Sequence, residues 1–104
     1  MDSRYYGDLG VIGMKGTEAF VQRVDAYLKQ WRPDDSRETY LMQADCPRFG
    51  TGEAKGLVRE TCRGRDIFIF SDMYNYGVTY KMYGMNVPMS PDDHYQDLKR
   101  IIGA

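Results

Sequence analysis

The sequence predicts a single α/β domain with a mostly parallel sheet, flanking helices and a protruding β-turn or hairpin. A short apolar segment at residues 9–14 leads through a small polar turn into a segment with helical periodicity at residues 17–31. A second apolar run, at residues 67–70, has the length of one buried strand. A strong helix-start signal follows at residues 90–93. Strands that alternate with helices in this way are typical of a parallel sheet covered by helices.

The length, charge and cysteine content of the chain limit its class. At 104 residues it forms one domain at most. Fourteen basic and fifteen acidic residues give a net charge of −1, which argues against a nucleic-acid or membrane-surface partner. No apolar stretch approaches the roughly 18 residues of a membrane-spanning helix, and the polar residues 1–8 indicate no signal peptide. Cys46 and Cys62 have no C-x-x-C spacing, so we expect reduced thiols in a cytoplasmic protein.

The first predicted strand and helix are joined by the turn Lys15-Gly16-Thr17. Thr17 is a plausible N-cap, and Arg32-Pro33 stops the helix. Between them, apolar side chains recur at helical spacing at Phe20, Val21, Val24, Tyr27, Leu28 and Trp31. We expect the turn to be a tight strand-to-helix connection, with anion binding by its backbone N–H groups as the alternative.

The middle of the chain predicts two strands joined by a turn that contains two glycines. Residues 39–46 form the first strand and residues 55–59 its partner. The turn between them presents Phe49 and Glu53. An exposed aromatic ring can stack on an adenine, and a carboxylate can accept hydrogen bonds from an amino group or a ribose hydroxyl. The alternative is a hairpin in which Phe49 simply packs.

A second turn, before the strand at residues 67–70, carries Thr61, Arg63 and Arg65 around a glycine. A hydroxyl and two guanidinium groups suit phosphate, because arginine forms bidentate hydrogen bonds to it. The alternative is a solvated turn, which is the commonest fate of such charges.

Residues 72–89 form a long connection with no clear period. A loop of this length is uncommon unless it is functional or lies at an interface. Its many tyrosine and methionine side chains suit either a partner-facing surface or a lid packed on its own domain.

The last helix begins at Ser90, which can cap it, with Pro91 at the first helical position and acidic residues in the first turn. Its expected apolar face consists of Tyr95, Leu98, Ile101 and Ile102. His94 is the only histidine, and we expect it on the surface. One histidine and two distant cysteines make no metal-binding pattern.

Residues 48–53 and 59–69 together resemble the ribose-phosphate pyrophosphokinase (phosphoribosyl pyrophosphate synthetase) family. That family has an R-F-x-D-G-E turn followed by R-E-S-V-R-G-x-D-V-F-I, which leads into its fourth strand. The resemblance extends more weakly to both ends, with Asp92–Leu98 a loose match to the family's N-D-N-L-M-E-L-L. It implies that residues 1–104 are a truncated, phosphoribosyltransferase-like N-terminal half-domain. The expanded connection at residues 72–89 is the largest departure from the family pattern.

The resemblance also implies roles for individual residues. Phe49 would stack on the adenine of ATP, and Thr51 and Glu53 would hydrogen-bond to the nucleoside, although Thr51 replaces the usual Asp or Asn. Family enzymes assemble as dimers within hexamers, and this turn reaches the ATP site of a neighbouring subunit. Thr61 and Arg63 match positions that help form a regulatory phosphate or ADP site.

The activity that the resemblance implies is transfer of the diphosphoryl group of ATP to ribose 5-phosphate, which gives phosphoribosyl pyrophosphate and AMP with Mg²⁺. The family's metal and sugar-phosphate groups come from later segments, so we expect no catalytic or metal-binding residue in this chain and no activity of the chain alone. Two alternatives remain open. One is a non-catalytic homologue that regulates the enzyme, and the other is an unrelated α/β nucleotide-binding or interaction domain.

Overall fold

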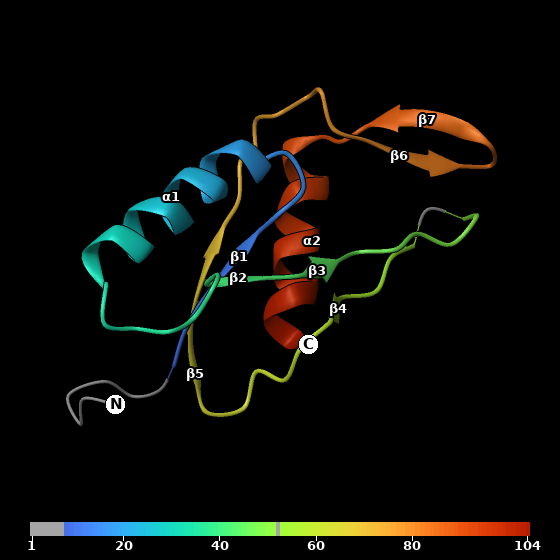
Figure 1. Ribbon diagram of the computed structural model, residues 1–104. Coiled ribbons are helices and arrows are strands. Elements are labelled where there is room, and N and C mark those ends of the chain that lie inside the picture. The colour runs from blue at the N-terminus through green and yellow to red at the C-terminus, as the bar shows by residue number, and fades with distance from the viewer. Residues whose placement is uncertain (1–7, 52) are drawn as a thin grey trace.

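The computed structural model describes residues 8–51 and 53–104, and the predictions for residues 1–7 and for the turn glycine Gly52 lie outside them. The chain is a mixed α/β structure in which a small parallel sheet is flanked by two helices (Figure 1). In chain order the elements are β1 (Asp8–Gly13), α1 (Glu18–Trp31), β2 (Leu41–Met42), β3 (Ala44–Asp45), β4 (Leu57–Val58), β5 (Arg65–Phe70), β6 (Thr79–Met82), β7 (Met85–Pro88) and α2 (Pro91–Gly103).

The parallel sheet has the strand order β2-β1-β5, with β1 at its centre. β1 pairs with β5 over its whole length, from Asp8 opposite Arg65 to Gly13 opposite Phe70. Its other edge pairs with the two residues of β2. The predicted parallel sheet with flanking helices is therefore confirmed.

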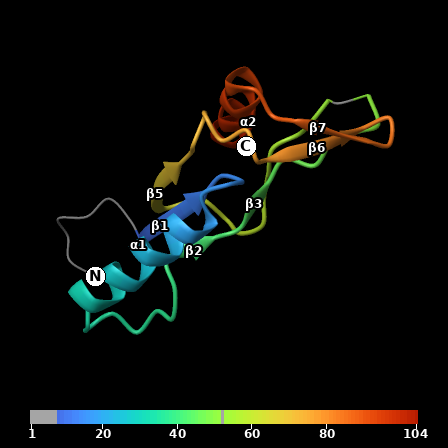
Figure 2. The same cartoon turned by 90° about the horizontal axis from the view of Figure 1, so that it is seen from above.

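Both faces of the sheet are covered, because successive side chains of a strand point to opposite faces. Val11 packs with Val21 of α1 and with Tyr40 on one face. Ile12 packs with Met42 and with Ile101 of α2 on the other face. Figures 1 and 2 accordingly show α1 and α2 on opposite sides of the sheet.

The helix α1 has the predicted bounds, but its connection to β1 differs from the expected cap. Thr17 occupies the N-cap position, yet its hydroxyl donates to the carbonyl of Met14 at 2.6 Å and makes no cap hydrogen bond. The N–H of Gly16 donates to the carboxylate of Glu18 at 2.9 Å. Because a side chain of the helix itself occupies this N–H, the turn fits the tight connection better than an anion site.

The buried face of α1 contains only the aliphatic part of the predicted apolar set. Val21 and Asp25 are buried, whereas the aromatic residues Phe20, Tyr27 and Trp31 are more than half exposed. Asp25 is buried because it accepts hydrogen bonds from the Thr39 hydroxyl at 2.8 Å and from the Tyr40 N–H at 2.7 Å.

The helix α2 begins with a complete capping box between Ser90 and Asp93, as predicted. The prediction that His94 lies on the surface is wrong, since it is only 2% exposed. Its Nε2 lies 2.8 Å from the carbonyl oxygen of Asn75, in the segment between β5 and β6. Of the predicted apolar face, Ile101 is buried, but Tyr95 and Ile102 are exposed.

Two arms, each built on a pair of antiparallel strands, extend from this core in the same direction (Figures 1 and 2). The first arm is the ribbon of β3 and β4, so the predicted strand at residues 39–46 is in fact divided between β2 and β3. The second arm is the β6–β7 hairpin, which lies in the segment 72–89 that showed no period. Its two turn residues, Tyr83 and Gly84, have φ values of 51° and 80°, as a type I′ turn requires.

Candidate functional site

The turn that the sequence singles out lies at the tip of the first arm. Phe49 is 56% exposed there, and Thr51 and Glu53 are exposed beside it. The N–H of Phe49 donates to the carbonyl of Glu53 at 2.7 Å, and Arg48 pairs with Ala54 in a β-bridge. The structure thus places the three predicted nucleotide contacts together on one exposed turn closed by backbone hydrogen bonds.

Arg48, which directly precedes Phe49, is held between two other elements. Its Nη2 lies 3.0 Å from Oδ2 of Asp97 on α2. Its guanidinium carbon lies 4.4 Å from the ring centroid of Tyr80 on β6. The side chains of Arg48 and Asp97 are only 10% and 9% exposed. Sequence reasoning missed this cluster, because its members are up to 49 residues apart.

The same aspartate is linked to two further residues. Nη1 of Arg100 lies 2.6 Å from Oδ1 of Asp97, so two guanidinium groups balance one carboxylate. The thiol of Cys46 donates to the backbone carbonyl of Asp97. Burial raises the pKa of this thiol to about 11, and the nearby carboxylate of Asp97 adds to the shift. Cys46 is therefore protonated at neutral pH and has a packing role, since the thiolate is the nucleophilic form.

The two arms also touch at their tips. The N–H of Tyr83, in the β6–β7 turn, donates to the carbonyl of Gly50 at 3.0 Å. The turn at the end of the first arm is therefore attached to the second arm on both sides of Phe49, through Arg48 and through Gly50.

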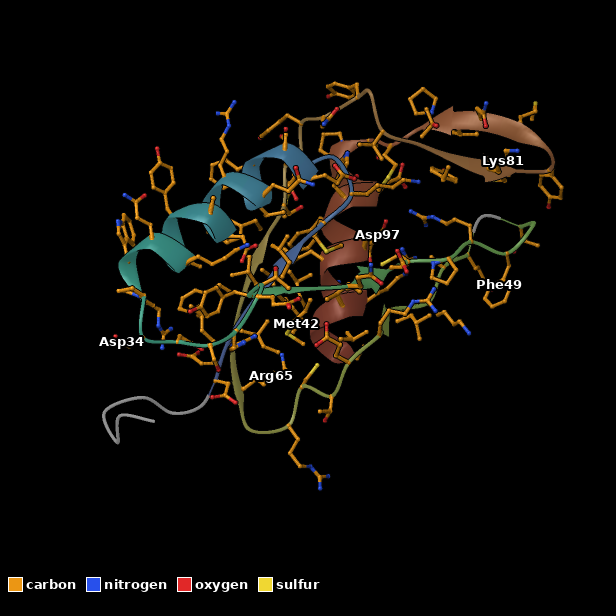
Figure 3. All side chains as sticks on the ribbon, viewed as in Figure 1. Asp34, Met42, Phe49, Arg65, Lys81 and Asp97 are labelled. Atoms are coloured by element: carbon orange, nitrogen blue, oxygen red, sulfur yellow. The ribbon has the colours of Figure 1, made fainter. Side chains whose placement is uncertain are left out.

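A groove of about 990 Å³ lies beside the arms, where β1 and β2 end. In open α/β sheets, ligands bind outside the carboxyl ends of the strands. Its lining comes from the β1–α1 turn, the two arms and α2, and includes Met14, Lys15, Gln43, Arg48, Lys81 and Asp97. Phe49, Thr51 and Glu53 are not part of the lining. Figure 3 shows Phe49 directed away from the hairpin that carries Lys81.

The predicted phosphate turn lies elsewhere in the molecule. Thr61 and Arg63 are both exposed, and the Thr61 hydroxyl accepts a hydrogen bond from the Arg63 N–H at 3.4 Å. Arg65 instead directs its guanidinium group toward Glu60, at 3.5 Å. This turn precedes β5, at the opposite end of the sheet from the arms (Figure 1), so the structure does not bring the two predicted sites together.

Residues 8–51 and 53–104 contain no group of three or more His, Cys, Asp or Glu side chains placed to hold a metal ion. Within the same residues, neither helix has the length and apolar character needed to cross a membrane.

No family model matches the chain, and no curated protein or solved structure does so either.

Proposed function

We propose that this chain provides the adenine-binding turn and a subunit contact of a ribose-phosphate pyrophosphokinase, and that its fold is the N-terminal, phosphoribosyltransferase-like half-domain of that enzyme. One observation carries the proposal: Phe49 lies exposed at the tip of a hydrogen-bonded turn, next to Thr51 and Glu53. A large exposed aromatic ring on a connecting segment marks a binding role more often than a packing role.

The chemistry of this turn suits an adenine nucleoside. The ring of Phe49 offers a face on which a purine can stack, which is worth about 1–3 kcal/mol. The carboxylate of Glu53 can accept hydrogen bonds from the amino group of adenine or from a ribose hydroxyl, and the Thr51 hydroxyl can donate or accept. The turn therefore recognises the nucleoside part of ATP, whose diphosphoryl group is transferred to ribose 5-phosphate.

The phosphates and the acceptor sugar require other groups. Mg²⁺, when bound, neutralises charge on the transferred phosphates, and we place its ligands outside this chain. Phe49 does not line the groove of its own chain and points away from the hairpin that carries Lys81, which favours a site shared between subunits of a cytoplasmic homo-oligomer. Thr61 and Arg63 form the candidate regulatory phosphate site, separate from the nucleotide turn.

The test is the substitution Phe49→Ala in the enzyme that contains this chain. We expect the KM for ATP to rise about tenfold or more, because stacking is lost, while the KM for ribose 5-phosphate changes little. Phe68→Ala is a matched control, because Phe68 is 53% exposed but lies on β5. Equal effects of Phe49→Ala on both substrates would show that Phe49 is a packing residue and would remove the basis of the proposal.

A second candidate function, assembly with a catalytic homologue as a non-catalytic regulator, is favoured by the exposed apolar side chains outside the turn. Trp31 on α1 is 72% exposed, and Tyr74, before the hairpin, is 78% exposed. Such residues are enriched in protein interfaces. This candidate predicts that the chain cosediments with a separate, active enzyme and changes its rate without any turnover of its own.

A further inference from the structure

Arg48 makes two contacts that only an arginine can make at once. Its Nη2 donates to Oδ2 of Asp97 at 3.0 Å, while its guanidinium carbon lies over the ring of Tyr80, 4.4 Å from the ring centroid. A planar guanidinium group can donate hydrogen bonds and lie over an aromatic ring at the same time. A lysine ammonium has no planar face and would keep only one of these contacts in the same geometry. Because Arg48 and Asp97 are almost fully buried, their interaction is screened by water much less than a surface ion pair.

The position of Arg48 determines where Phe49 points. Arg48 lies in a β-bridge, and neighbouring side chains of an extended segment point to opposite faces. With Arg48 held against α2 and β6, the ring of Phe49 must face outward, as Figure 3 shows. The hydrogen bond from Tyr83 to Gly50 holds the chain on the other side of Phe49.

We propose that Arg48, Asp97 and Tyr80 are positioning residues for the nucleotide turn, and that the β6–β7 hairpin thereby sets the affinity of the site for adenine nucleotides. The inference takes its ligand, an adenine nucleotide, from the proposed function. The contacts of Arg48 with Asp97 and Tyr80 do not depend on that function. The hairpin contributes to nucleotide affinity without touching the nucleotide, because it restricts the turn to the conformation in which Phe49 is exposed. Preorganisation of this kind lowers the entropy cost of binding.

Three variants test the inference. Arg48→Lys keeps the charge but removes the planar face, Tyr80→Ala removes the ring, and Tyr80→Phe keeps the ring as the matched control. Hydrogen exchange measures the turn directly in the free chain, because the Phe49 N–H is bonded to Glu53. We expect about tenfold faster exchange there in Arg48→Lys and Tyr80→Ala. We expect no change in Tyr80→Phe, or at the Val11 N–H, which is bonded to Tyr40 in the core.

The same variants are then assayed in the enzyme. The two disruptive substitutions are expected to raise the KM for ATP about tenfold, with kcat and the KM for ribose 5-phosphate within about twofold of wild type. Unchanged exchange at Phe49 would overturn the inference, and so would an equal acceleration at Phe49 and Val11, which indicates global destabilisation. If Phe49→Ala leaves the KM for ATP unchanged, the proposed function fails, and the exchange data alone still decide whether Arg48 and Tyr80 position the turn.

Discussion

Gly56 shows how closely the first arm approaches the last helix. A Cβ atom at this position would lie 2.3 Å from the backbone carbonyl oxygen of Arg100, well inside contact distance. The obstacle is backbone in a helix, so it cannot move aside as a flexible side chain would. The first arm therefore packs on α2 at its base, and Arg48 links the arm to α2 nearer its tip.

We predict that Gly56→Ala lowers the free energy of unfolding by about 1–3 kcal/mol, because the added methyl group forces the arm and α2 apart. Urea denaturation followed by circular dichroism measures this loss. Gly50→Ala is the matched control, because a Cβ atom at Gly50 meets nothing within 4 Å. Equal stability of the two variants would mean that the arm does not pack on α2 as described.

The burial of individual polar residues could not be predicted from the sequence. His94 was expected in solvent because charged residues surround it, yet the segment that covers it is 19 residues away along the chain. Asp25 lies in a helix whose predicted apolar positions did not include it, and its hydrogen-bond partners belong to the next connection. Tertiary partners decide which polar groups are buried, and a local pattern contains no information about them.

At the scale of elements, the strongest local signals in the sequence were sufficient to place the helix boundaries. The capping residues of α2 and the proline after α1 predicted where the helices begin and end. The strands predicted at residues 39–46 and 55–59 contain β2, β3 and β4, which have only two residues each, too few for their bounds to be recognised from alternation. The β6–β7 hairpin was missed because its type I′ turn contains Tyr83-Gly84 rather than the usual Asn-Gly. The Phe49 turn, in contrast, lies where its glycines predicted a turn.

We predict that Tyr83→Asn stabilises the hairpin. Tyr83 has a φ of 51°, a left-handed conformation that asparagine tolerates much better than other non-glycine residues. Its side chain is 73% exposed, so little packing is lost. A gain of about 1 kcal/mol in the free energy of unfolding is expected from relieved backbone strain, measurable as a higher Tm. The control is Tyr74→Asn, at a similarly exposed tyrosine outside the turn. A lower Tm for Tyr83→Asn would mean that the Tyr83 ring packs against a neighbour and outweighs the strain.

At the scale of the whole molecule, the chain is elongated. Its extents are 48 × 25 × 19 Å, and its radius of gyration is 15.3 Å, against about 13 Å for a compact domain of this length. Both arms extend from one end (Figure 2), and their exposed residues include Phe49, Tyr83 and Met85. Projecting arms with large apolar side chains at their tips are suited to reach a second chain.

We predict that the Phe49 turn acts on the ATP site of a neighbouring subunit. Phe49 and Glu53 are exposed at the tip of the first arm, and neither residue lines the groove beside the arms. A single chain therefore does not bring the Phe49 turn and this groove together. The test mixes two impaired forms of the proposed enzyme, one with Glu53→Ala and the other with its ribose-phosphate loop destroyed. In a shared site, the intact turn of one subunit meets the intact loop of the other, and activity returns in mixed oligomers in proportion to their abundance. Each form assayed alone is the control for residual activity. Mixed oligomers that form, as native mass spectrometry would show, but have no activity would mean that each turn serves its own chain.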